Sequence, residues 1–429
     1  MKRNNYTVRI NKTTINAIII LIIMFISEDT YIFGTNSNAS FVSASRYLPI
    51  GIVIFLLFKI RFKFNISANK RKIKAYIVMV ISFGIICFVN HDNINRISLK
   101  FLWITISFLL CIMLSFNDFA ESYIKAICFV SVSAIVFTGL AYISPSIIRR
   151  FPAIINTSNA KIYTCGFAGL FDGVLDRSAI RTQGIFWEPG VFQMYINLAI
   201  ALELLYKRRI NKKHLYTLII ALLLTFSTTG YIAFAWLVTV YFFVIKSRHK
   251  EDISKRFIII ILFFIAAIIL FQFSSIGDMI FGKIYDRTND NYGSTTVRLA
   301  GILVSLKIAL SNPIHGIGMS MMKDEFLDVS ILLRDILGGW TDDNTNTILY
   351  QFAAYGIPYG LFFTIGTFKF GNYFANGRKI ITITILIMMF ILYVGENLQY
   401  SFFPYIIVLY GYGWRRDNLF SKSEVLQQI

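Results

Sequence analysis

Long apolar stretches alternate with short clusters of lysine and arginine along this chain, and this alternation limits what it can fold into. The clusters recur at about every second boundary between apolar stretches, at residues 2–12, 59–74, 207–213, 246–256, 378–379 and 415–416. Multi-spanning membrane proteins keep such residues in their cytoplasmic loops. Since 56% of the residues are hydrophobic and only 15% are charged, a bilayer accounts for the apolar surface better than a water-soluble core does. The sequence therefore predicts an all-α integral membrane protein.

A helix needs about 20 apolar residues to cross the hydrocarbon core of a bilayer. About twelve stretches are suitable, at residues 13–34, 46–60, 75–90, 98–116, 123–145, 184–206, 215–228, 230–245, 257–273, 345–369, 379–395 and 399–414. An even number of spans puts both termini in the cytoplasm, in agreement with the charge clusters. The chain, 1–429, is expected to form a single polytopic membrane domain.

Two segments between the predicted spans are long and face outward, at about 146–183 and 274–344. Within the second, residues 297–311 form a stretch too short and too cationic to span comfortably. We expect a helix packed at the outer membrane surface there. Four polar or small residues fall close to one stripe at helical spacing: Arg298, Gly301, Ser305 and Asn312.

The net charge of +19 would indicate nucleic-acid binding in a soluble protein. Here the cations cluster in short predicted cytoplasmic loops, where topology and anionic lipid headgroups account for them, so no nucleic-acid partner is expected. The cysteines and histidines show no metal-ligand spacing, and neither a metal nor another cofactor is expected.

The first candidate site is the stretch from Arg181 to Glu188, at the start of the sixth predicted span. A helix start explains Glu188 followed by Pro189, because proline and an acidic side chain both suit a first helical turn. It does not explain the combination with Arg181 and Trp187 beside a long outward loop. A carboxylate at the membrane boundary is suited to proton transfer, so Glu188 is a candidate catalytic base.

The second candidate is Arg298 on the short helix. An arginine beside a membrane-surface cavity is costly to place and binds a phosphate group through two parallel hydrogen bonds. The following stretch, residues 312–318 (NPIHGIG), could be a helix stop and turn.

The third candidate precedes the predicted span 345–369, and the fourth lies between the last two predicted spans. Asp342 and Asp343 could cap that helix or bind a metal, although no third ligand is evident; we favour Asp343 and Asn344 facing a substrate at the bilayer surface. Glu396, between the last two predicted spans, could contact the same substrate or only make the connection soluble.

Taken in order, several motifs resemble a known family. They are RTQGIFWEPGVFQMY, LTFSTTGYIAF, VRLAGILVSLKIALSNPIHGIG, DDNTNTILYQFAAYGIPYG and GENLQYSFFPYIIVLYG. Over about residues 180–414 the chain resembles the O-antigen polymerase (Wzy) and O-antigen ligase superfamily of bacterial envelope glycosyltransferases. The resemblance implies undecaprenyl-pyrophosphate-linked oligosaccharides as donor and acceptor, at the outer face of the plasma (inner) membrane. It also implies that Arg181 and Arg298 contact the pyrophosphate.

The resemblance leaves alternatives. The ligases, which transfer the glycan to lipid A-core, carry a histidine beside an asparagine where this chain has Asp343–Asn344, so a polymerase of O-antigen or capsule is favoured. A flippase of lipid-linked oligosaccharide is the alternative from another class. For a polymerase, Glu188 or Asp343 is expected to be the base, with Glu188 slightly favoured because a helix start at the membrane boundary is more desolvated. Asn344 and Glu396 are expected to bind substrate, and a chain-length-determining co-polymerase could be a partner.

Overall fold

A computed structural model describes residues 11–60, 66–177, 179–245, 292–375 and 378–414. The chain divides into two compact units. Unit 1 comprises residues 1–48, 114–203 and 209–225, and unit 2 comprises residues 49–113, 204–208 and 226–429. The predicted span 257–273 lies outside the described residues.

Within the described ranges, each predicted span overlaps a helix. Among the residues that the structure describes, five helices are long and apolar enough to cross a membrane: Asn69–Val89, Ile94–Met113, Phe116–Ile143, Pro189–Tyr206 and Thr347–Ala375. Five further apolar helices are shorter: Lys12–Phe25, Tyr47–Ile60, Thr228–Phe243, Lys379–Gly395 and Phe402–Gly413. A mostly helical membrane protein is therefore confirmed, whereas the number of twelve spans stays a prediction.

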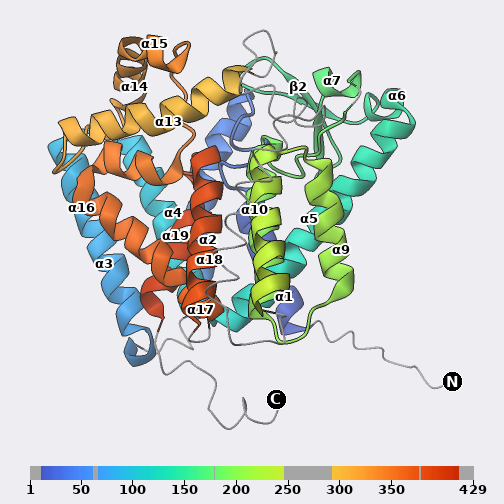
Figure 1. The fold of residues 1–429 in the computed structure, drawn as a ribbon, viewed down its shortest axis with the longest axis horizontal. Coiled ribbons are helices and arrows are strands. Elements are labelled where there is room, and N and C mark those ends of the chain that lie inside the picture. The colour runs from blue at the N-terminus through green and yellow to red at the C-terminus, as the bar shows by residue number, and fades with distance from the viewer. Residues whose placement is uncertain (1–10, 61–65, 178, 246–291, 376–377, 415–429) are drawn as a thin grey trace. The chain divides into compact units, whose positions relative to one another are not determined.

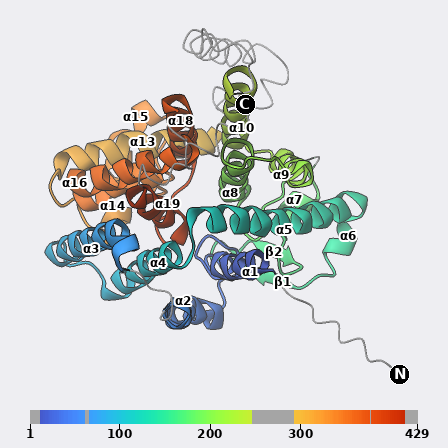
Figure 2. The same ribbon diagram turned by 90° about the horizontal axis from the view of Figure 1, so that it is seen from below.

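Unit 1 is built around one long helix. Its helices are α1 (Lys12–Phe25), α5 (Phe116–Ile143), α8 (Pro189–Ala201) and α9 (Lys212–Leu224), with the π-helical turn η1 (Leu202–Tyr206) beginning directly after α8. Figure 2 shows α1 on one side of α5 and α8 and α9 on the other, and all three pack against α5. The helix α2 (Ala39–Ile60) begins in unit 1 and continues into unit 2.

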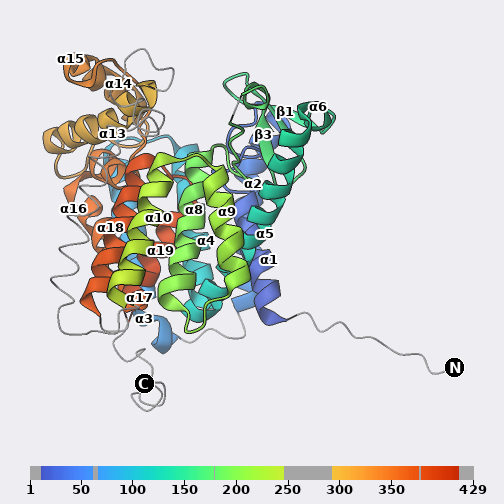
Figure 3. The same cartoon turned by 45° about the vertical axis from the view of Figure 1, so that its right-hand side comes forward.

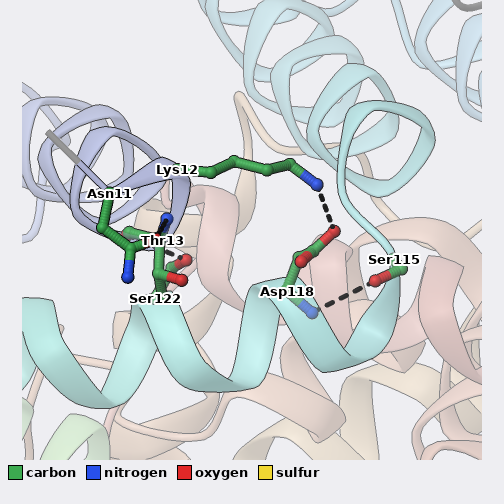
Figure 4. Close-up of polar contacts among 6 residues, drawn as sticks. All are labelled: Asn11, Lys12, Thr13, Ser115, Asp118 and Ser122. Carbon is green, nitrogen blue, oxygen red and sulfur yellow. Dashed lines mark hydrogen bonds and ion pairs between the residues drawn. The ribbon is translucent and has the colours of Figure 1, made fainter. Parts of the chain in front are cut away.

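Polar side chains fix the starts of α1 and α5 against each other (Figure 4). The Ser115 hydroxyl accepts a hydrogen bond from the Asp118 backbone N–H, as an N-cap residue does. The Asp118 carboxylate also pairs with the Lys12 ammonium at 3.1 Å, and the Ser122 hydroxyl donates to the Thr13 carbonyl. These contacts set where the two helices begin.

The segment between α5 and α8, which we predicted to face outward, contains a small sheet that the sequence did not predict (Figure 3). Its elements are α6 (Pro145–Ile148), β1 (Ala153–Ile155), β2 (Lys161–Thr164), β3 (Gly169–Phe171) and α7 (Asp172–Leu175). The strands are antiparallel in the order β1-β2-β3, with Ile154 opposite Ile162 and Tyr163 opposite Leu170. Tyr163 and Leu170 pack with Phe137 of α5 in a buried apolar cluster, which holds the sheet on the end of that helix.

Unit 2 contains α3 (Ile66–Val89), α4 (Ile94–Met113), α10 (Thr228–Val240), η2 (Tyr241–Ile245), α13 (Tyr292–Ser311), α14 (Met322–Leu332), α15 (Arg334–Leu337), α16 (Thr347–Phe370), α17 (Asn372–Ala375), α18 (Lys379–Gly395) and α19 (Phe402–Gly413). In Figure 1, α13 lies crosswise above α16, and α14 and α15 lie beyond it. The sequence predicted a helix at 297–311, and α13 includes it; its place at the membrane surface stays a prediction.

The helix α16 is broken at Gly356, whose φ of 82° and ψ of 169° are not helical. The break frees backbone groups that the loop after α13 satisfies. Ile317 N–H donates to the Ala353 carbonyl at 3.1 Å, and Gly318 N–H donates to the Ala354 carbonyl at 2.9 Å. Broken helices are tolerated at membrane depth only where protein or water satisfies the freed groups in this way.

Two glycines allow this close contact. A Cβ on Gly316 would lie 2.4 Å from the Ala354 carbonyl carbon, and one on Gly356 would lie 2.3 Å from the Ile314 carbonyl oxygen. Both glycines also have positive φ, which side chains disfavour. The NPIHGIG stretch is therefore a helix stop followed by a loop that fits the break in α16.

A buried lysine lies beside the same break. Lys100 of α4 is fully buried, and its ammonium donates to the Tyr355 hydroxyl at 2.7 Å. The rings of Phe83, Tyr350, Tyr355 and Tyr405 lie 4.3 to 5.9 Å from that ammonium. Cation–π attraction helps to compensate for the lost hydration. Lys100 thus connects α4 to the part of α16 before the break.

Candidate functional site

In unit 2, a run of polar residues leads into α16, and side-chain caps fix its backbone. The Asn346 side chain accepts from Leu349 N–H at 2.8 Å and so caps the helix. The Asn344 side chain accepts from Asn346 N–H at 2.8 Å, and Asp343 N–H donates to the Thr341 hydroxyl at 3.0 Å. Such short side-chain bonds are typical of Asn, Asp and Thr just outside helices. They place Asp343 and Asn344 in a defined loop.

One face of α13 meets this loop. The Asn344 amide donates to the buried Ser305 hydroxyl at 2.9 Å. At Gly301 a Cβ would lie 3.2 Å from the Thr345 hydroxyl, so the backbones approach closely there. Arg298 lies three residues before Gly301 and therefore on the same face. It is partly buried and makes no hydrogen bond or ion pair with any residue that the structure describes.

The predicted residue Glu396 lies in a loop tied to the same helix start. The Thr347 hydroxyl donates to the Glu396 carbonyl and accepts from Leu398 N–H. Glu396 itself is buried, with 4% of its surface exposed. The predicted residues Arg298, Asn344 and Glu396 thus belong to segments that meet at the first turn of α16. Sequence reasoning missed Thr347, whose only signal was its place in a run of Thr and Asn.

Several buried side-chain amide atoms near this point have no hydrogen-bond partner among the described residues. They are Asn346 Nδ2, Gln351 Oε1, Asn397 Oδ1 and Gln399 Oε1. A buried polar group without a partner costs about 1–3 kcal/mol, so such groups call for a water or a ligand. An amide both donates and accepts hydrogen bonds, as sugar hydroxyls and water also do.

Asp342 and Asp343 of this loop differ in their electrostatic surroundings. Asp342 pairs with Lys323 of α14 at 3.0 Å. Asp343 has exposed surface, yet partial loss of hydration around its carboxyl raises its pKa, the neighbouring Asp342 raises it further, and Lys323 lowers it. Asp343 therefore holds a proton more readily than a free aspartate, as a general base requires. No group of three or more potential metal ligands occurs in the described part of the chain.

In unit 1, Arg181 is anchored to the end of a helix. Its Nε donates to the Thr225 carbonyl at 3.1 Å, and Thr182 N–H donates to the Leu224 carbonyl at 2.9 Å. Thr225 is the C-cap of α9, where a cation also interacts favourably with the helix dipole. Part of the role of Arg181 is therefore structural.

Glu188 is the N-cap residue of α8, with Pro189 following, as the sequence predicted. Its side chain makes no capping hydrogen bond and is partly exposed. One residue earlier, Trp187 N–H donates to the Asp29 carbonyl at 3.0 Å. The buried Asp29 carboxylate accepts from the Tyr195 hydroxyl at 2.5 Å.

Sequence reasoning did not assign a role to Asp29. The first predicted span, 13–34, includes it, whereas α1 ends at Phe25 and Asp29 lies in the following turn region. Its signal was an acidic residue at the end of an apolar run. Of the predicted site residues, Arg181 and Glu188 belong to unit 1, and Arg298, Asp343, Asn344 and Glu396 belong to unit 2.

Residues 215–364 match the family model described as O-antigen ligase. The matched range spans about a third of the chain and includes Arg298, Asp343 and Asn344. No curated protein and no solved structure matches the chain.

Proposed function

We propose that this chain, which residues 215–364 place in the O-antigen polymerase and ligase superfamily, polymerises oligosaccharide repeat units. The donor is the growing glycan on undecaprenyl pyrophosphate, and the acceptor is a single repeat unit on the same lipid. The reaction occurs at the outer face of the bacterial plasma membrane. The main support is the gathering of α13, the Asp343–Asn344 loop and the Glu396 loop at the start of α16.

This glycosyl transfer requires few protein side chains. An acceptor hydroxyl attacks the anomeric carbon of the donor, and the bond from that carbon to the pyrophosphate oxygen breaks. The electron pair leaves with the lipid pyrophosphate, whose charge needs cationic stabilisation. The hydroxyl proton passes to a carboxylate.

Arg298 is the best-placed cation for the leaving pyrophosphate. It is partly buried, where charge interactions are stronger than in water, and none of the described residues pairs with it. Asp343 is our preferred base in unit 2, since its raised pKa keeps it able to accept a proton. Glu188, in unit 1, is the alternative base, and the resemblance implies that Arg181 of the same unit contacts phosphate. Asn344 supplies an amide beside Arg298.

A ligase is the second candidate, because the matching family model carries that description. Ligases in this superfamily use a histidine beside an asparagine at the start of the span that follows the long outward loop. The stretch from Asp342 to Thr347 contains no histidine. This difference favours the polymerase.

A gel of surface polysaccharide from cells with and without this protein tests the proposal. Loss of the ladder with a single repeat still on lipid A-core supports a polymerase. Loss of all glycan from the core, with polymer left on undecaprenyl pyrophosphate, shows a ligase instead. Accumulation of single repeats on the cytoplasmic side shows a flippase and overturns the proposal.

A further inference from the structure

An exposed indole lies directly before the candidate site of unit 2. Trp340 is 63% exposed, whereas the four other tryptophans are buried or partly buried. It follows α15 and precedes Thr341, Asp342 and Asp343. Leu332 of α14 and Ile336 of α15 are also exposed, and exposure of such residues needs no explanation on its own. The hydrogen bonds that fix the backbone at Trp340 do call for an explanation.

The backbone is fixed on both sides of Trp340. Before it, Gly339 N–H donates to the Arg334 carbonyl at 3.1 Å. After it, Thr341 N–H donates to the Ser330 hydroxyl at 3.1 Å, and that hydroxyl donates to the Thr341 carbonyl at 2.7 Å. An aromatic side chain on a fixed backbone has only two side-chain torsions to order when it binds, which is why such residues serve as rigid contacts in binding surfaces.

The chain after Trp340 brings in charged groups that recognise hydroxyls. Asp342 follows two residues later, and its carboxylate pairs with Lys323 at 3.0 Å at a partly exposed position. Carboxylates accept hydrogen bonds from hydroxyls, and ammonium groups donate to them. An indole face offers a flat apolar surface. A ligand that has one flat apolar face and many hydroxyls at its edge fits both features, and a sugar ring is such a ligand.

We propose that Trp340 is a stacking platform for a sugar ring of the glycan substrate, with Asp342 and Lys323 at its edge. This inference rests on the proposed function, since the glycan is the part of a lipid-linked substrate that extends away from the bilayer. Tryptophan is also common at membrane interfaces. However, α14 and α15, which carry the anchors Ser330 and Arg334, lie on the far side of α13 from α16 and α18 (Figures 1 and 3). That position favours the glycan over the bilayer.

Binding of a lipid-free oligosaccharide to the purified full-length protein tests the platform. The probe is the repeat unit released from the surface polysaccharide of the host, titrated by calorimetry. The W340A variant should bind it about threefold to tenfold more weakly, the range expected for loss of one aromatic contact. W340F should retain most of the affinity. L332A is the matched control, since Leu332 of α14 is 72% exposed, and it should bind as the wild type does.

Three results overturn the platform. The first is that W340A binds the oligosaccharide like the wild type. The second is that L332A loses as much affinity as W340A. The third is that brominated lipid quenches the Trp340 emission while the oligosaccharide leaves it unchanged. The last result assigns the indole to the bilayer. Because the indole is largely in solvent, W340A should keep the thermal midpoint of the wild type, and W340F provides a second variant if it does not.

The polysaccharide gel separates this inference from the proposed function. If deletion of the protein removes the ladder, but W340A binds the oligosaccharide and builds chains normally, the polymerase stands and the platform falls. If deletion leaves the ladder intact while oligosaccharide binding depends on Trp340, the platform stands and the polymerase falls.

Discussion

Arg181 in unit 1 and Arg298 in unit 2 have different surroundings. Arg181 Nε donates to the carbonyl of the C-cap residue of α9, so the guanidinium supports a helix end. Arg298 lies on the face of α13 that meets the Asn344 loop, and no described residue pairs with it. A partly buried cation that supports no local structure is the stronger candidate for a ligand contact.

The carboxylates in the two units differ in a similar way. Glu188 begins α8, a position that helix formation alone explains. Asp343 lies in a loop whose caps are made by its neighbours Thr341, Asn344 and Asn346, so its own carboxylate is not needed to build the loop. The comparison therefore points to unit 2 as the place of the chemistry.

Exchange of the two carboxylates for amides tests that conclusion most strongly. D343N should lower the polymerisation rate by about 10²–10⁴, the usual contribution of a general base. E188Q should lower it far less, and both variants should keep their thermal midpoints. The measurement is the rate of chain growth by purified protein on lipid-linked repeat units. The opposite order of effects would place the base in unit 1.

Removal of Arg298 should have the next largest effect. R298A should lower the rate by about 10²–10³, as for loss of one charge-stabilising donor. Its thermal midpoint should stay unchanged, because none of the described residues depends on it. R298K should recover only part of the rate, since lysine lacks the bidentate geometry. The matched control is K307A, an exposed cation of the same helix; an equal loss in K307A would mean that only the net charge of α13 matters.

Removal of Arg181 should affect stability as well as rate. R181A loses a charged hydrogen bond to a helix end, which should cost about 1–2 kcal/mol of unfolding free energy. The rate should fall by about tenfold if one phosphate contact worth about 1.4 kcal/mol is lost. R177A, an exposed cation a few residues earlier, is the control. Unchanged stability in R181A would show that the contact to Thr225 is incidental and would remove the contrast with Arg298.

The helices were accessible from the sequence because hydropathy depends only on local composition. Apolar runs and cationic flanks located the helical segments, and the spacing of Arg298, Gly301 and Ser305 correctly put these residues on one helix. The predicted end of the first span was wrong by nine residues: the prediction continued past the polar residues 27–30 to residue 34, whereas α1 ends at Phe25.

The features that the sequence did not predict depend on contacts between segments that are distant in the chain. The break in α16 requires the Gly316 loop to approach Gly356, and the sheet of unit 1 requires a core shared with α5. Asp29 and Thr347 become candidates only through partners far away in sequence, Tyr195 and Glu396. Such contacts cannot be predicted from a single sequence. The resemblance located the loop of Asp343 and Asn344, but not the face of α13 that contacts it.

The pH profile of chain growth provides the smallest and most specific test. Asp343 must be deprotonated to act as a base, so the rate should rise with pH through its pKa. D342N removes a neighbouring negative charge that raises this pKa, so the rising limb should move to lower pH. K323M removes the positive charge that lowers it, so the limb should move to higher pH. D335N changes an acid with 95% of its side chain exposed and should leave the limb in place.

Opposite shifts in D342N and K323M are expected only if the titrating group lies close to both charges, as Asp343 does. If Glu188 is the base, the E188Q variant should lose the limb. A shift of the same sign in D342N and K323M would mean that these changes act through folding rather than through the pKa of Asp343. The thermal midpoints of the two variants decide between these explanations, because a purely electrostatic effect at so exposed a pair should change stability by less than about 1 kcal/mol.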